Sequence, residues 1–118
     1  MINVSPSDGN ILCSTRTTTG TLITIPAAGV WTGHLVIAAS IAAAGTGTPR
    51  ISVSGTNAEP ADGTVVHQLS LSGLALTTVA DSCMTEVIVK APAGNSITLE
   101  FNTGGATSAS ASATGFLI

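Results

Sequence analysis

The sequence predicts an all-β fold with eight or nine strands and essentially no helix. Gly- and Pro-rich turn signals recur roughly every 8–12 residues, a spacing typical of a β-sandwich or a β-barrel. Between the turns, apolar and polar residues alternate. In residues 97–102, for example, three large apolar residues are separated by polar ones. A period of two places each apolar set on one face of a sheet.

The same reasoning assigns most of the other strands. Residues 50–54 and 68–72 alternate in the same way. In residues 86–90 we expect Ile88 to face outward between two charged neighbours and the flanking valines to face inward. Residues 21–25 carry apolar residues on both faces, which predicts a strand covered on both sides.

Two segments rich in alanine require a choice. Residues 30–44 could form a helix because Ala favours helix, but they hold many β-branched residues, Gly33 near the start and no charged face. We therefore predict a strand. Residues 108–114 alternate Ala with Ser or Thr and lead into the apolar residues 115–118. We predict a final strand there, in preference to a low-complexity linker, with side chains small enough for another layer or subunit to approach closely.

Charge is unusually scarce in this chain. Nine of the 118 side chains are charged, three basic and six acidic, whereas about a quarter is usual. A surface so poor in charge tends to associate, so we infer that much of it is covered in the working state. Three basic residues are too few for a patch that binds nucleic acid or a membrane surface.

Length and patterning predict a single β-sandwich domain over residues 1–118, with residues 1–9 as a possible N-terminal arm. The longest aliphatic run, residues 35–39, is far shorter than the roughly 20 residues of a spanning helix. The N-terminus shows no secretory signal, so we expect synthesis in the cytoplasm without export.

The residues that usually carry catalysis are few. His34 and His67 are the only histidines, and neither lies in a recognisable motif, so we interpret both as hydrogen-bonded sheet residues. Cys13 and Cys83 are too few for a disulfide scaffold, and we interpret them as free thiols that pack as small hydrophobic residues. We predict that the chain is not an enzyme.

Metal and cofactor motifs are also weak. The four His and Cys residues lack the paired spacing of a zinc site. Glu59 and Asp62 share the loop 55–63, but calcium needs six to eight oxygen ligands and no third carboxylate follows, so we interpret this loop as solvated. No phosphate-binding glycine loop is present. We expect neither a metal nor a cofactor.

Two segments carry a resemblance to a known family. They are residues 21–33, TLITIPAAGVWTG, and residues 92–99, PAGNSITL. The first segment resembles the opening hairpin of small β-sandwich proteins of tailed bacteriophages. The second segment, together with the Ala/Ser-rich last strand, resembles the closing strands of the same proteins. Such modules serve as capsid decoration (cement) proteins, and similar ones cap the distal ends of tailspikes and fibres. The resemblance covers most of the chain, and its motifs are structural.

This resemblance implies a jelly-roll-like sandwich and a homotrimer on the exterior of the virion, with the major capsid protein as partner. It carries no catalytic residue. The alternative that it implies is the distal head of a tail fibre or tailspike, which would bind a host surface glycan or receptor. The chain contains no fibrous shaft or coiled-coil segment, which favours the decoration protein.

The residues that we expect to make contacts lie in the N-terminal arm, at the start of the longest strand and on one face of the last strand. Trp31 is interpreted first as a packing residue and second as a platform for a ligand. An arm that pairs with a neighbour would explain why two apolar residues precede Pro6. The predicted contact residues are Ile2, Val4, Trp31, Ala109, Ala111 and Ala113.

The arm hypothesis predicts that deletion of residues 1–5 weakens binding to the capsid while the oligomer still folds. Capsid occupancy measured by quantitative gel analysis of purified particles tests it, with circular dichroism as the control for folding. Unchanged occupancy would rule out the arm.

Overall fold

A computed structural model gives the fold of residues 11–25, 33–44, 47–68, 80–91, 94–106 and 108–117. These residues form strands, turns and loops, and none of them is helical. The all-β prediction is therefore confirmed. The strands of the described residues are β1 (Ile11–Arg16), β2 (Gly20–Ile25), β3 (Gly33–Ala44), β4 (Arg50–Ser54), β5 (Val65–Gln68), β6 (Ala80–Ala91), β7 (Ile97–Asn102) and β8 (Ser108–Leu117).

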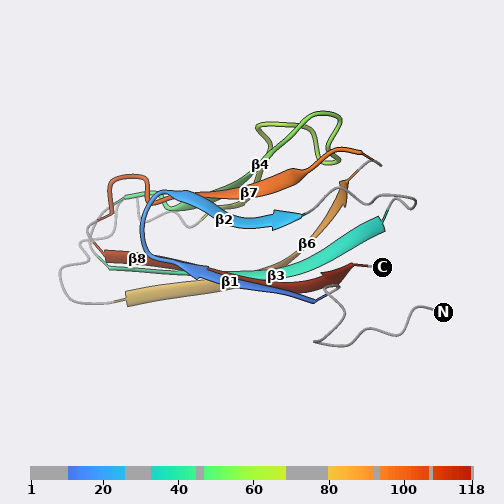
Figure 1. Ribbon diagram of the computed structural model, residues 1–118. Coiled ribbons are helices and arrows are strands. Elements are labelled where there is room, and N and C mark those ends of the chain that lie inside the picture. The colour runs from blue at the N-terminus through green and yellow to red at the C-terminus, as the bar shows by residue number, and fades with distance from the viewer. Residues whose placement is uncertain are drawn as a thin grey trace.

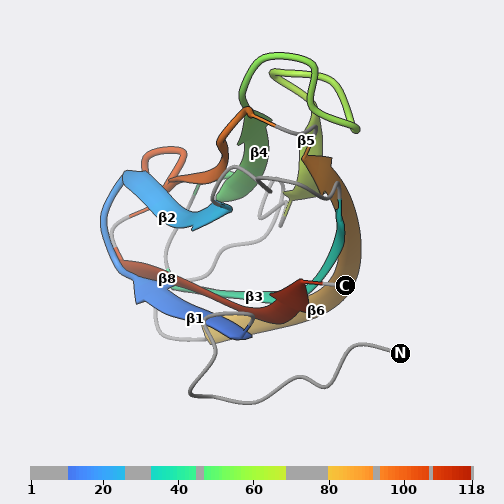
Figure 2. The same ribbon diagram turned by 45° about the vertical axis from the view of Figure 1, so that its right-hand side comes forward.

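The strands build two four-stranded antiparallel sheets that face each other (Figures 1 and 2). The first sheet has the order β1-β8-β3-β6, and the second has the order β2-β7-β4-β5. Of these strands, only β4 and β5 are both consecutive in the chain and neighbours in a sheet, and each of the six remaining connections joins one sheet to the other. This is the winding of a jelly roll, an antiparallel β-sandwich, as predicted.

The core fills the space between the sheets because alternate residues of each strand point inward. The odd-numbered residues from 35 to 41 in β3 and from 87 to 91 in β6 are buried. Along β4 and β7 the apolar residues are buried while their polar neighbours are half-exposed. In β6 the inward valines and the outward Ile88 lie as predicted. The largest completely buried side chains are Phe101, Ile25, Leu35, Ile37, Ile41, Ile51, Ile97 and Leu99.

The prediction that β2 is covered on both sides was wrong. Leu22, Ile23 and Ile25 are all buried in the same core. A shift in register against β7 lies between Thr21 and Ile23, and such a bulge inserts an extra residue, so that Leu22 and its neighbour both turn inward. Thr24 remains exposed on the outer side.

The segment 30–44 does contain a strand, β3, as expected, and the Ala/Ser tail forms β8. The two strands pair along their length, with Ala39 opposite Ala113. Part of the predicted strand 68–72 lies outside the described residues, where β5 ends at Gln68.

Ala113 gives a direct test of this core. It is completely buried and its register partner is another buried alanine, so Ala113→Leu forces extra methylenes into a filled layer. We expect the free energy of unfolding to fall by about 1–3 kcal/mol in urea titrations. The matched variant Thr114→Leu, on the exposed side of the same strand, should change it by less than about 0.5 kcal/mol. Equal effects of the two variants would contradict the inward placement of Ala113.

Candidate interaction surface

The outer surface of the first sheet carries a group of apolar side chains. The register brings Phe116 of β8, Val36 of β3 and Ile88 of β6 side by side in one row across three strands. The next rows contain Cys13, Ala38 and Met84. We call these six residues, Cys13, Val36, Ala38, Met84, Ile88 and Phe116, the apolar outer face.

Several of these side chains are far more exposed than their character would suggest. The exposed fractions are 74% for Met84, 58% for Ile88 and 40% for Phe116. Together with Val65 of the second sheet, they are the exposed large hydrophobic side chains of the described residues. Three of the four therefore belong to one surface, and a contiguous apolar surface of this kind is typical of a contact site.

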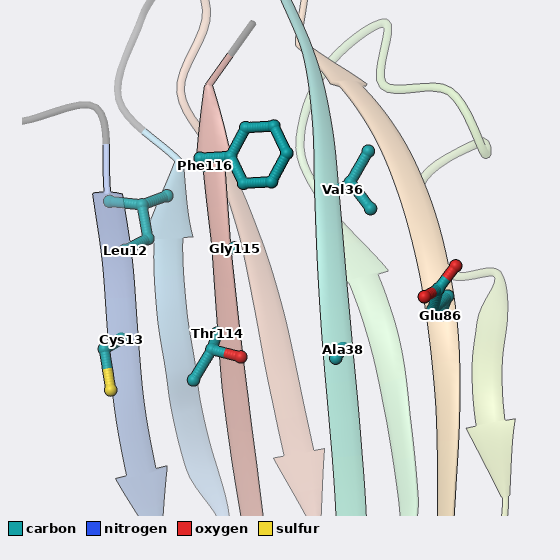
Figure 3. Close-up of a pocket in the computed structure, with 8 residues that line it drawn as sticks. All are labelled: Leu12, Cys13, Val36, Ala38, Glu86, Thr114, Gly115 and Phe116. Atoms are coloured by element: carbon teal, nitrogen blue, oxygen red, sulfur yellow. The ribbon is translucent and has the colours of Figure 1, made fainter. Parts of the chain in front are cut away.

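This surface is also hollowed. An open pocket of about 410 Å³ lies between Leu12 and Cys13 on β1 and Glu86 on β6 (Figure 3). Phe116 and Val36 lie at one end of the lining, while Thr114 and Ala38 lie further along the same strands. Its lining residues are Leu12, Cys13, Val36, Ala38, Glu86, Thr114, Gly115 and Phe116, among which Glu86 is the one charged residue.

Gly115 keeps β8 close to β3 beneath this pocket. A Cβ atom at Gly115 would collide with the carbonyl oxygen of Val36, which is backbone and cannot rotate away. Further along the same two strands, the hydroxyls of Ser40 and Ser112 are 2.6 Å apart and share a hydrogen bond across the outer surface. The floor of the surface is therefore a closely paired, fixed pair of strands.

The outer surface of the second sheet is different. Its strands present Thr, Ser, Asn, Glu and Arg side chains, and several are joined by hydrogen bonds. Thr98 Oγ1 donates to Glu100 Oε1 over 2.9 Å, and Thr21 Oγ1 donates to the same oxygen over 3.2 Å. Water satisfies such groups well, so this side of the sandwich suits solvent.

Of the six contact residues predicted from the sequence, three lie outside the described residues and three belong to the core or pack against it. Ile2, Val4 and Trp31 lie outside the described residues. The alanine face of β8 was assigned to the wrong side: Ala111 and Ala113 are buried in the chain's own core, and Ala109 packs against it. The physical reason is that the small side chains make room for the opposite sheet rather than for another subunit.

Sequence reasoning missed most of the apolar outer face. The outward position of Ile88 was predicted, but its neighbours Val36 and Phe116 are brought beside it by strand pairing. Cys13 is a free thiol as predicted, but it is exposed rather than packed as a small hydrophobic residue.

Cys13 and His67, the cysteine and the histidine whose side chains the structure describes, are not brought together. Cys13 lies on the outer surface of the first sheet, whereas His67 is buried on β5 of the second. No three His, Cys, Asp or Glu residues gather as metal ligands within the described ranges. Asp62 instead accepts a hydrogen bond of 2.9 Å from the backbone of Gly55, which closes its own loop. In the same ranges, no helix is long and apolar enough to cross a membrane.

Comparison of the chain with protein-family models, with curated proteins and with solved structures finds no match in any of the three. The functional argument therefore depends on the residues and on the geometry of the two outer surfaces.

The exposure of Cys13 predicts its reactivity. In the dilute chain, a water-soluble maleimide should modify Cys13 at a rate close to that in urea, because the thiol is open to solvent. Peptide mass spectrometry locates the label, and Cys13→Ser is the control. Strong protection of Cys13 in the monomeric chain would contradict its position on the outer surface.

Proposed function

We propose that this chain is a structural protein of a virus particle, a decoration (cement) protein that binds the outer surface of a tailed-phage capsid and stabilises the shell. Its partners would be the major capsid protein and copies of itself. The single observation that supports this most is the apolar outer face on one sheet, opposite a hydroxyl-rich, hydrogen-bonded surface on the other. One side suits a protein partner and the other suits solvent.

The physics of such a role requires area and complementarity rather than chemistry. A protein that binds only the assembled shell adds its binding free energy to the stability of that shell. The described residues fit this requirement, because a rigid pair of strands, β3 and β8, holds Val36 and Phe116 at the surface. Glu86 gives the pocket lining one charge, which a basic residue of the partner would neutralise.

The proposal includes no catalytic step. Cys13 could act as a nucleophile and His67 as a base, but they belong to different sheets. Cys13 is exposed on the outer side of the first sheet, whereas His67 is buried on the second sheet. Nucleophilic catalysis requires the two groups within hydrogen-bond reach. A non-enzymatic subunit made in the host cytoplasm and placed on the capsid exterior is consistent with this separation, and the homotrimer implied by the family resemblance remains part of the proposal.

A second candidate is the distal head of a tail fibre or tailspike that binds a host glycan or receptor. The observation that favours it is the loop 55–64, which projects from the second sheet and exposes polar residues such as Thr56, Asn57 and Asp62 (Figure 1). Polar groups on a projecting loop are suited to sugar hydroxyls. The apolar outer face has no role in this alternative.

Electron microscopy of purified particles separates the two candidates. The decoration proposal predicts density for the chain over the capsid surface, whereas density confined to the tail tip would contradict it and support the fibre head.

Surface variants test which side binds. Phe116→Asp or Ile88→Asp should lower capsid occupancy by about tenfold or more, because either places a charge in a desolvated apolar contact. Thr24→Asp, on the outer side of the second sheet, is the matched control and should leave occupancy unchanged. A loss with Thr24→Asp alone would assign binding to the other sheet.

A further inference from the structure

The four sheet edges of the sandwich are not equivalent. β1 and β2 have six residues each and β5 has four, and the pairings of β2 and β5 contain register shifts. β6 has 12 residues and pairs with β3 from Ala80 to Ala91 without a shift. Short or bulged edges resist the addition of another strand, whereas a long regular edge invites it. Among the described residues, β6 is therefore the edge most open to pairing.

The backbone of β6 shows which of its groups face that open edge. Lys90 exchanges two hydrogen bonds with Glu59 on the side away from β3, over 2.7 and 3.1 Å. Successive residues of an antiparallel strand direct these groups to alternate sides. The N–H and C=O groups of residues 82, 84, 86 and 88 must therefore also point away from β3, and among the described residues only Glu59 pairs with this edge.

We propose that β6 pairs with β6 of a second copy of this chain, antiparallel about a two-fold axis, to form one continuous eight-stranded sheet. The loop that carries Glu59 already uses the edge at Lys90, so the stretch from Ala80 to Ile88 is the part of the edge that no described residue pairs with. The centre of that stretch is Met84. A symmetric pairing of the whole open stretch then places Met84 opposite Met84 of the second copy.

This register also suits the side chains. Met84 is the most exposed large hydrophobic side chain of the described residues, at 74%, and self-pairing covers it. Glu86 lies opposite Ser82, so the two glutamates avoid each other; a register centred on Glu86 would oppose like charges. In this register, each even-numbered residue of one copy faces an even-numbered residue of the other, and the two exchange two backbone hydrogen bonds, as in any antiparallel pair of strands. A two-fold contact in which the same residues serve both copies is the commonest form of self-association.

The inference goes beyond the proposed function, because it names a contact between copies rather than a contact with the shell. It places the two apolar outer faces side by side on one continuous sheet. Where the proposed homotrimer also forms, a two-fold contact of this kind joins copies from two different trimers.

Cysteine crosslinking tests the register. In a background of Cys13→Ser and Cys83→Ser, Met84→Cys should form a covalent dimer on mild oxidation, because Cα atoms of such a pair lie about 5.5 Å apart, within disulfide range. Glu86→Cys is the matched control. Its counterpart in the second copy lies four residues along the strand, about 13 Å away, so it should remain uncrosslinked. Equal or preferential crosslinking through Glu86→Cys would overturn the register.

Sedimentation of the full chain tests the contact itself. The unmodified chain should contain dimers, or multiples of dimers, at micromolar concentration, and Met84→Lys should dissociate them by at least about tenfold, since it opposes two like charges. Val65→Lys, which replaces an exposed apolar residue of the second sheet, should leave them intact. A chain that sediments only as monomers or trimers would overturn the inference. Location on the particle tests the proposed function separately.

Discussion

The structure depends on the alternation of side chains along β3 and β8, the two central strands of the first sheet. At their midpoint Ala39 and Ala113 face each other in register, and both are completely buried. Small inward residues at this point let the second sheet approach, so that its large side chains, Phe101 among them, fill the interior. Because a strand has a period of two, the same constraint determines which residues remain outside.

The consequence for function lies on the other side of those strands. Once Ile37 and Ile41 of β3 and Ala113 of β8 point inward, the alternate residues Val36 and Phe116 have to point outward. β6 adds Ile88 and Met84 to the same surface, and its long open edge extends that surface toward a neighbour. The two outer sides therefore differ: the first sheet exposes large apolar side chains, while the outer side of the second is polar and hydrogen-bonded.

The fold was largely predictable from the sequence, and the surface was not. Alternation in residues 50–54 and 97–102 gave the strands and the buried side of each one, because that information is local. In β2 the local pattern failed, since a bulge that depends on β7 turns Leu22 inward. The alanine face of β8 was predicted to contact another subunit, because small side chains indicate that another layer approaches closely. The sequence does not indicate which layer that is, and in the structure it is the chain's own second sheet. The apolar outer face joins residues from four strands that are distant in sequence, so it became visible only once the strand order was known.

The central claim is that assembly covers the outer side of the first sheet. Hydroxyl-radical footprinting of the free chain and of the chain on purified particles tests this directly, because Met84, Phe116 and Val65 are all exposed in the isolated subunit and all react. The account predicts that oxidation of Met84 and Phe116 falls on the particle while oxidation of Val65, on the second sheet, stays the same. Protection of Val65 with unchanged oxidation of Met84 and Phe116 would contradict it.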